Sequence, residues 1–396
     1  MQNDERSLES SILISEPTPE RPETHNPRGT TILSNDRSDR LTLDSFDYIH
    51  LHVGNAFQTM RFLCTTYSFD PVAYSGLETG CRDHISYVVE QGNIRIVVTS
   101  SLDPANGIGN EVKTHGDAVK EIAFTVSDAA EAFHLALLQG AIRVSDPITS
   151  EDEFGQASVA TIRAFGDVVH TFVERREYSG VFLPGYKQLR SGNRNRSPWL
   201  LDLDHVALSF PTGQLEQMTE FYTQTLSMGV GHEENIVTPN SAMNSRVVQN
   251  RSGTVRFPMM EPAASRRTSQ IEEFLKYNHG PGIQHLAFSS HDIVGAVRAF
   301  QSVGAEFLKT PAAYYDALDA RVGSIGQDTT ELRDCNILVD RDEWGYLLQI
   351  FSKTITARPT LFFELIQRAG ARGFGSGNIR ALFDAVEREQ ALRGNL

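Results

Sequence analysis

The stretch Gly-Pro-Gly-Ile-Gln-His-Leu-Ala-Phe, at residues 280–288, has a near copy earlier in the chain, Gly-Asp-Ala-Val-Lys-Glu-Ile-Ala-Phe at residues 116–124. Each copy is followed by an aspartate, a helix-like run and a Gly-Ala pair. A repeat of this kind predicts two tandem copies of one fold. The copies differ where chemistry would need a particular side chain, because Glu121 stands opposite His285.

The repeat extends on both sides of these stretches. Three further pairs of segments align: 48–53 with 203–208, 166–172 with 345–351, and 182–185 with 362–365. This alignment sets His50 opposite His205 and places no carboxylate opposite Glu364. The second copy alone therefore combines two histidines with a glutamate. We predict a metal site in the second copy and none in the first.

Size and composition limit the class of protein. A chain of 396 residues is long enough for two domains, and a formal net charge of −14 argues against binding to nucleic acid, which needs clustered cations. No apolar run approaches the roughly 20 residues of a spanning helix, so no membrane partner is expected. Three widely spaced cysteines are typical of a reducing compartment, and we expect a cytoplasmic protein.

The pattern of apolar residues and turn signals divides the chain into four parts. Residues 1–40 are polar and predict a disordered tail. Residues 41–185 form a first, metal-free domain, residues 186–198 a linker, and residues 199–396 a second, catalytic domain. Each domain is expected to be α+β, with paired βαβββ units curling into an open, barrel-like mixed sheet. The glycine-rich stretch before a final helix suits a segment that closes the mouth of a cavity.

Two imidazoles and one carboxylate with open positions are typical of non-haem Fe(II) sites. His205, His285 and Glu364 fall in three separate strand-like runs, which would hold such ligands rigidly. Each residue also has an ordinary explanation, because a single histidine in a strand is more often a hydrogen-bonded core residue. Glu364 could likewise pair with Arg358 or Arg368. The repeat favours the metal, since the three ionisable residues are not jointly kept in the first copy.

Several motifs carry a family resemblance: Leu-Asp-His-Val at 203–206, Gly-Ile-Gln-His-Leu-Ala at 282–287, Glu-Leu-Ile-Gln-Arg at 364–368 and Gly-Phe-Gly at 373–375. With them the chain after residue 40 resembles the 4-hydroxyphenylpyruvate dioxygenase family of the vicinal-oxygen-chelate superfamily. The resemblance implies two tandem vicinal-oxygen-chelate domains, Fe(II) on His205, His285 and Glu364, and a small aromatic 2-oxo acid and O2 as substrates. It also implies substrate-binding roles for Ser245, Gln270, Gln284, Gln349, Phe351, Phe362 and Asn378.

Two departures from the family pattern concern the product. The pattern in enzymes of tyrosine breakdown looks like Pro-Ile-Asn-Glu-Pro, where this chain has Pro-Met-Met-Glu-Pro from Pro258. In the later glycine motif their pattern looks like Gly-Asn-Phe, where this chain has Gly-Asn-Ile. Aliphatic Met260 and Ile379 are similar to 4-hydroxymandelate synthase, the sister enzyme of this family. We therefore expect Pro258, Met260 and Ile379 to steer the reaction toward 4-hydroxymandelate, which suits secondary metabolism. The alternative is homogentisate formation.

Two other classes stay open. A metal-free binding paralogue would lack iron altogether, and a glyoxalase or ring-cleaving relative would share the βαβββ unit and similar ligands. The polar set Gln270, Gln284 and Gln349, together with the residues after Glu364, argues against the latter. Exposed sheet edges in the first copy predict a surface for a homodimer.

Overall fold

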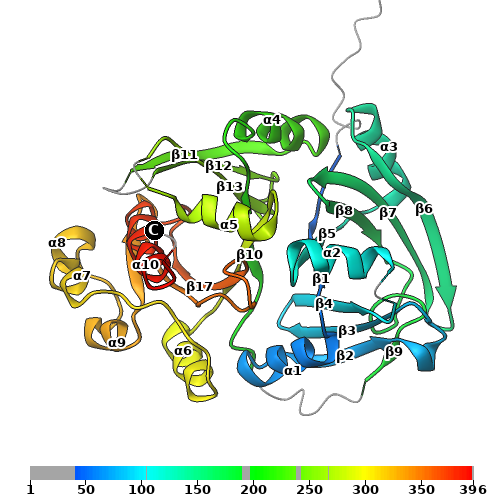
Figure 1. Ribbon diagram of the computed structural model, residues 1–396, viewed down its shortest axis with the longest axis horizontal. Helices are drawn as coiled ribbons and strands as arrows, with labels where there is room; N and C mark the ends of the chain where they lie inside the picture. The colour runs from blue at the N-terminus through cyan, green and yellow to red at the C-terminus, as the bar shows by residue number, and fades with distance from the viewer. Residues whose placement is uncertain (1–40, 104, 190–196, 238–241, 266, 395–396) are drawn as a thin grey trace, which may run out of the picture. The chain divides into compact units, whose positions relative to one another are not determined.

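The computed structural model describes residues 41–103, 105–189, 197–237, 242–265 and 267–394, so the tail predicted over 1–40 lies outside the described residues. Residues 41–394 hold two mixed β-sheets with the same connectivity (Figure 1). In each half, a unit of strand, helix and three strands occurs twice, and the two units join through an antiparallel pair of strands. This confirms the predicted α+β class and the paired βαβββ units.

The first half carries a sheet of order β6-β7-β8-β5-β1-β4-β3-β2-β9. The predicted linker over 186–198 begins at the edge of this sheet, because β9 pairs with β2. In chain order the elements are β1 (Ser45–His52), α1 (Ala56–Thr66), β2 (Asp70–Ser75), the 3-10 turn η2 (Leu77–Thr79), β3 (His84–Gln91), β4 (Ile94–Ser101), α2 (Gly107–His115), β5 (Ala118–Thr125), α3 (Ala129–Leu138), β6 (Arg143–Asp152), β7 (Gly155–Phe165), β8 (Val168–Glu174) and β9 (Lys187–Gln188).

The second half carries a sheet of order β11-β12-β13-β10-β14-β17-β16-β15. Its elements are β10 (Leu203–Ser209), α4 (Leu215–Glu220), the π-helical turn η3 (Phe221–Thr225), β11 (Gly229–Val237), β12 (Ala242–Gln249), β13 (Arg256–Pro262), α5 (Gln270–Asn278), β14 (Gly282–Ser289), α6 (Ile293–Ser302), α7 (Ala312–Asp316), α8 (Leu318–Val322), α9 (Thr329–Asp334), β15 (Leu338–Arg341), β16 (Tyr346–Phe351), β17 (Phe362–Ala369) and α10 (Ser376–Leu392). None of the helices in the described ranges is both long and apolar enough to span a membrane.

The aspartates that recur in both copies begin equivalent helices. Asp128 accepts a hydrogen bond from the Glu131 backbone at the start of α3, at 2.8 Å. Asp292 accepts one from the Gly295 backbone at the start of α6, at 2.9 Å. Such N-caps satisfy backbone donors that the first turn leaves unpaired, and each stabilises a helix by about 1 kcal/mol. The repeat therefore retains these residues for local structure.

Strand β14 lies in the middle of the second sheet, and all of its residues except Ser289 are buried. A strand covered on both faces normally reads as a continuous apolar run. Gln284 and His285 interrupt this run, and buried polar groups of this kind need partners to offset their lost hydration. The fold thus places unusual polar side chains at the centre of the sheet.

The strand ladders define which residues occupy equivalent places in the two halves. In the second half, Ala287 of β14 pairs with His205 of β10 and with Glu364 of β17. His285 lies two residues before Ala287 and therefore shares its face of the sheet. The three predicted metal ligands accordingly start from three adjacent strands.

The same ladders show that two of the predicted pairs of segments were wrong. Segment 48–53 is out of register with 203–208 by two residues. Segment 166–172 lies in β8, which corresponds to β17 and not to residues 345–351 of β16. Ala123 of β5, which matches Ala287, pairs with Tyr48 of β1 and with Thr171 of β8. Tyr48, rather than His50, therefore stands where the second half has its first histidine. A shift of two residues keeps every side chain on the same face, so the alternation of the sequence could not reveal the error.

The segment predicted to match the strand of Glu364 has a different counterpart. It supplies Phe182, whose ring centre lies 5.2 Å from that of Tyr48. Phe374 makes the same contact with His205, also at 5.2 Å. Phe182 therefore corresponds to the aromatic residue that follows β17, and not to the strand itself.

His170 of β8 is a buried histidine that touches the second half. Its Nε2 lies 3.0 Å from the hydroxyl of Tyr222 in η3, and its ring stacks on Phe257. Complete burial lowers the pKa of His170 to about 3. The folded protein thus keeps this imidazole neutral across the physiological range.

We expect His170 to make the protein sensitive to acid. The unfolded chain takes up a proton near pH 6.5 and the folded chain only near pH 3, so stability is lost as the pH falls between these values. Between pH 7 and pH 5 this amounts to roughly 2 kcal/mol. Urea denaturation should show a fall in stability between these pH values that is about 2 kcal/mol smaller in His170→Phe than in the wild type. The exposed His134→Gln serves as the control and should behave like the wild type.

Candidate metal centre and substrate pocket

The three predicted ligands converge in the second half. One ligand atom from each of His205, His285 and Glu364 lies within 4.8 Å of the others. Glu364 Oε2 is 3.2 Å from His205 Nε2 and 3.5 Å from His285 Nε2. All three residues are buried. The separations leave room for one ion between the three groups. The donor set of two nitrogens and one oxygen suits Fe(II), so the residues present fit the predicted ion.

His205 is held by a carboxylate on its far side. Asp204 Oδ1 lies 2.9 Å from His205 Nδ1, so Nδ1 donates its proton to Asp204 and the lone pair of Nε2 would be available to an ion bound between His205, His285 and Glu364. Burial would raise the pKa of Asp204, but hydrogen bonds from Arg368 and His205 hold it well below its usual value. Burial would lower the pKa of His205, and the carboxylates of Glu364 and Asp204 raise it instead. Burial and the charge on His205 lower the pKa of His285.

Asp204 forms an ion pair with Arg368 through two hydrogen bonds, and the first half contains an equivalent ion pair. Arg368 Nε and Nη2 each donate to Asp204, both at 2.8 Å. In the first half Arg175 Nε donates to Asp47 at 3.1 Å, and its Nη2 makes the second contact. The duplication has thus kept this ion pair in both halves, although Asp47 has Tyr48 rather than a histidine as its neighbour.

This pair of ion pairs allows a matched comparison. Asp204→Asn should weaken Fe(II) binding by about 10–100-fold, because outer partners of this kind orient a ligand and raise its basicity. Asp47→Asn breaks the equivalent ion pair, with a similar loss of stability, and should leave Fe(II) affinity unchanged. Anaerobic titration calorimetry measures both variants. Equal affinities for the two variants would contradict the orienting role of Asp204.

Glu364 is oriented by a chain of amide hydrogen bonds. Gln349 Nε2 donates to Glu364 Oε1 at 2.8 Å, and Asn378 Nδ2 donates to Gln349 Oε1 at 2.8 Å. The hydroxyl of Tyr314 in turn lies 2.7 Å from Asn378 Oδ1. Asn378 is fully buried in this chain, so the structure places it behind Gln349. One carboxylate oxygen of Glu364 is thereby tied back, and the other faces the imidazoles.

A pocket of about 590 Å³, partly open to solvent, lies against the three ligands. Eight of the predicted pocket residues line it: Ser245, Gln270, Gln284, Gln349, Phe351, Pro258, Met260 and Ile379. Phe362 and Asn378 lie outside the lining, and Phe362 instead stacks on the His285 ring at 4.9 Å. The lining also includes residues that were not predicted to belong to the pocket: His232, Met243, Val247, Phe374, Leu382 and Phe383.

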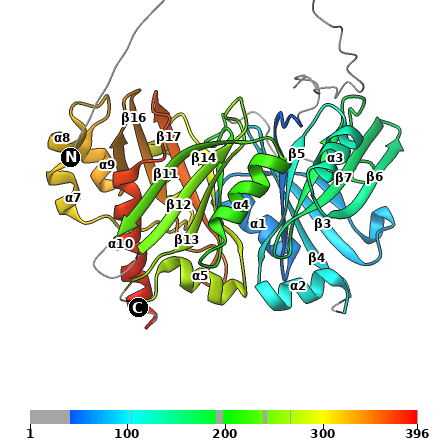
Figure 2. The same ribbon diagram turned by 90° about the horizontal axis from the view of Figure 1, so that it is seen from above.

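One wall of this pocket is apolar and belongs to the C-terminal helix. Met260 of β13 packs with Phe383 and Ile379 of α10. Figures 1 and 2 both show α10 beside β11 and β12, and Arg393 at its end pairs with Glu273 of α5 at 2.6 Å. Helix α10 therefore forms part of the pocket wall, and its predicted gating role stays a prediction.

A polar group also faces the pocket without a partner of its own. The Oε1 atom of Gln270 is buried, and no residue in the described ranges bonds to it. An unpaired buried acceptor is destabilising by about 1–3 kcal/mol, so it indicates a bound donor. The pocket thus offers an apolar wall, a polar acceptor and a candidate metal centre.

Comparisons with known proteins agree with this site. A family model for the Glyoxalase/Bleomycin resistance protein/Dioxygenase superfamily matches residues 202–350. A 4-hydroxyphenylpyruvate dioxygenase from Aspergillus fumigatus is 39% identical over 89% of this chain and 94% of its own length. One from Xenopus tropicalis is also 39% identical, over 89% of this chain and 93% of its own. The chain belongs to the 4-hydroxyphenylpyruvate dioxygenase family. It is thus an enzyme built from two tandem vicinal-oxygen-chelate domains, as predicted.

The chain is also similar to a solved structure that is named for a different reaction. A mutant 4-hydroxymandelate synthase from Streptomyces coelicolor is 39% identical, covers 88% of this chain and 100% of its own, and superposes with a TM-score of 0.81. A xylose isomerase-like TIM barrel/4-hydroxyphenylpyruvate dioxygenase fusion protein, at 23% identity and a TM-score of 0.69, shares the fold. The family members thus include both reactions that the sequence left open.

Proposed function

We propose that this enzyme oxidises 4-hydroxyphenylpyruvate with O2 to 4-hydroxymandelate and CO2 at an Fe(II) centre. One oxygen atom enters the new carboxylate as CO2 leaves, and the other enters the benzylic carbon, so the atoms balance. His205, His285 and Glu364 would hold the iron, whose chemistry when bound is the activation of O2 for oxidative decarboxylation. Relatives named for this substrate, and a related structure named for this product, support the proposal.

The protein groups around the centre have separate tasks in this proposal. Asp204 and Gln349 orient His205 and Glu364, so the ligands need no rearrangement when the ion binds. Gln270 offers its unpaired Oε1 to the substrate. The ionised keto acid has one hydrogen-bond donor, the ring hydroxyl, and that group would therefore lie toward Gln270.

The apolar side chains of Met260 and Ile379 determine which product forms, because they set the position of the substrate ring. The product depends on which carbon of the substrate lies nearest to the transferred oxygen, and a misplacement of about 1 Å is enough to change a rate greatly. A phenylalanine at position 379 would fill ring-sized volume, and an asparagine at position 260 would anchor the substrate. Ile379 leaves that space open, and Met260 is a flexible apolar filler. The ring can then tilt, which brings the benzylic carbon forward.

The second candidate is formation of homogentisate from the same substrate. The observation that favours it is the name shared by several relatives at 37–40% identity over nearly the whole chain. In that case Met260 and Ile379 would repack the wall without moving the substrate. A cytoplasmic location and a homodimer stay predictions under either candidate.

Product analysis separates the two candidates. The full-length protein is incubated with 4-hydroxyphenylpyruvate, ferrous iron and ascorbate, and the products are separated by chromatography. We expect 4-hydroxymandelate to accumulate with consumption of O2. Homogentisate as the main product would overturn the proposal and establish the second candidate.

A further inference from the structure

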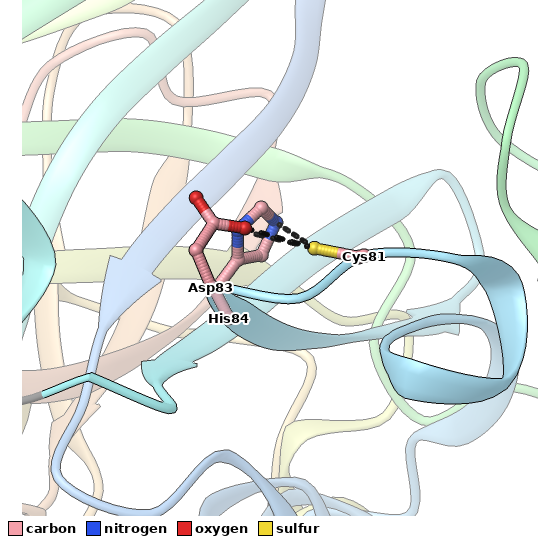
Figure 3. Close-up of side chains that lie close together, drawn as sticks. All are labelled: Cys81, Asp83 and His84. Atoms are coloured by element: carbon pink, nitrogen blue, oxygen red, sulfur yellow. Dashed lines mark hydrogen bonds and ion pairs between the residues drawn. The ribbon is translucent and has the colours of Figure 1, made fainter.

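A second group of metal-binding side chains lies in the first half, away from the pocket. Cys81, Asp83 and His84 converge where the turn after η2 enters strand β3 (Figure 3). One ligand atom from each residue lies within 4.8 Å of the others. The thiol and the imidazole are partly buried, and the carboxylate is exposed to solvent. The group thus combines a sulfur, a nitrogen and an oxygen donor at the surface.

The separations between these atoms are close to the edges of a zinc tetrahedron. Cys81 Sγ lies 3.2 Å from Asp83 Oδ1 and 3.4 Å from His84 Nδ1, and Oδ1 lies 2.9 Å from Nδ1. Zinc bonds of about 2.3 Å to sulfur and about 2.0 Å to nitrogen or oxygen give edges of about 3.5 Å and 3.3 Å. The three donors therefore need to separate by a few tenths of an ångström to hold the ion. The imidazole ring must also turn to aim Nδ1 at the ion, because Cys81 Sγ lies nearly as close to Nε2, at 3.5 Å.

The backbone on both sides of the group is already held in place. Gly80 adopts a left-handed conformation with φ 93°, which turns the chain after η2. The Cys81 amide then donates to the Gly76 carbonyl at 3.0 Å. The Asp83 carbonyl accepts from the Leu102 amide at 2.9 Å. Because these bonds fix the loop, binding would order side chains rather than backbone, which lowers its entropic cost.

We propose that Cys81, Asp83 and His84 bind one Zn²⁺ ion, with water completing the coordination. A thiolate with an imidazole favours zinc over oxygen-seeking Mg²⁺ or Ca²⁺, and zinc binds such donors more tightly than Fe²⁺ does. Binding replaces the thiol proton, which passes to solvent. The bound ion joins the turn after η2 to strand β3 and removes the free thiol from oxidation.

Cobalt titration of the full-length protein tests the site, because a thiolate bound to Co²⁺ gives a near-ultraviolet charge-transfer band. In the Glu364→Gln variant, which loses the competing site of the second half, we expect the band to saturate at one equivalent of Co²⁺ and to disappear when Zn²⁺ is added. Cys81→Ser should abolish it, and His84→Gln should weaken Co²⁺ binding by more than about tenfold. Cys64→Ser, which removes another partly buried thiol of the same half, should leave it unchanged.

The readout is independent of the pocket in the second half. His205, His285 and Glu364 contain no sulfur, so Co²⁺ bound there gives no thiolate band. Glu364→Gln should therefore keep the band while losing enzymatic activity. The inference is overturned if no band forms or if the band survives Cys81→Ser. It is also overturned if the band of Glu364→Gln fails to saturate near one equivalent, as an adventitious ion would behave.

Discussion

Replacing Glu364 by Gln is expected to remove nearly all Fe(II) binding and enzymatic activity. The amide keeps the shape of the side chain but loses the negative charge that offsets the ion among buried groups, where Glu364 Oε2 lies 3.2 Å from His205 Nε2. The loss should exceed the roughly 10–100-fold typical of outer partners such as Asp204. Anaerobic titration with ferrous iron and consumption of O2 measure the two effects separately.

A buried glutamate of the first half supplies the control. Glu121 occupies the place of His285 and bonds to Tyr48 at 2.8 Å and to His50 at 2.9 Å. Glu121→Gln weakens these bonds and should lower the free energy of unfolding by about 1–3 kcal/mol. Iron affinity should not change. If Glu121→Gln removed iron binding as thoroughly as Glu364→Gln, the prediction of a single iron site in the second half would fail.

Replacing Met260 and Ile379 by the residues of the family pattern is expected to change the product. The double variant Met260→Asn with Ile379→Phe should shift the ratio of homogentisate to 4-hydroxymandelate by at least about tenfold, which needs a difference of only about 1.4 kcal/mol between the two barriers. The added ring fills the space that lets the substrate tilt, and the amide supplies an anchor. Chromatography after a single turnover gives the ratio directly.

Introducing the same two residue types at other positions of the pocket lining tests whether the effect on the product is specific to positions 260 and 379. Met243→Asn with Leu382→Phe also adds an amide and a ring to the pocket. Overpacking should lower the free energy of unfolding by about 1–3 kcal/mol without reversing the product. An unchanged ratio in the first pair, or the same shift in both pairs, would remove the steering role proposed for Met260 and Ile379.

The candidate metal centre could be predicted from the sequence because its three residues differ from their surroundings. His205, His285 and Glu364 are ionisable residues in apolar strand-like runs, and the repeat showed that the first copy does not keep them. The groups that orient them were not predicted. Asp204 is the chain neighbour of His205, but Arg368, which holds Asp204, and Tyr314, which bonds to Asn378, act across long distances in the chain, and such contacts leave no periodic signal.

The polar residues that line the pocket were predicted from the sequence, whereas its apolar residues were predicted only in part. Gln270 and Gln349 were found through motifs, whereas Leu382 and Phe383 lie in a helix whose apolar stripe predicts packing but not what it packs against. The reverse also occurred, since Asn378 was expected in the lining and lies behind Gln349. The distance of a side chain from the pocket depends on how α10 docks.

The amino-acid sequence by itself determined the repeat, the α+β class, the three candidate ligands and the substituted residues of the pocket wall, because composition and alternation are local properties of the chain. Only the tertiary structure decided the register of the two halves, which sets Tyr48 rather than His50 opposite His205. Strand alternation repeats every two residues, so shifts of two are equivalent in the sequence. The hydrogen-bond ladder, formed between strands distant in the chain, distinguishes them.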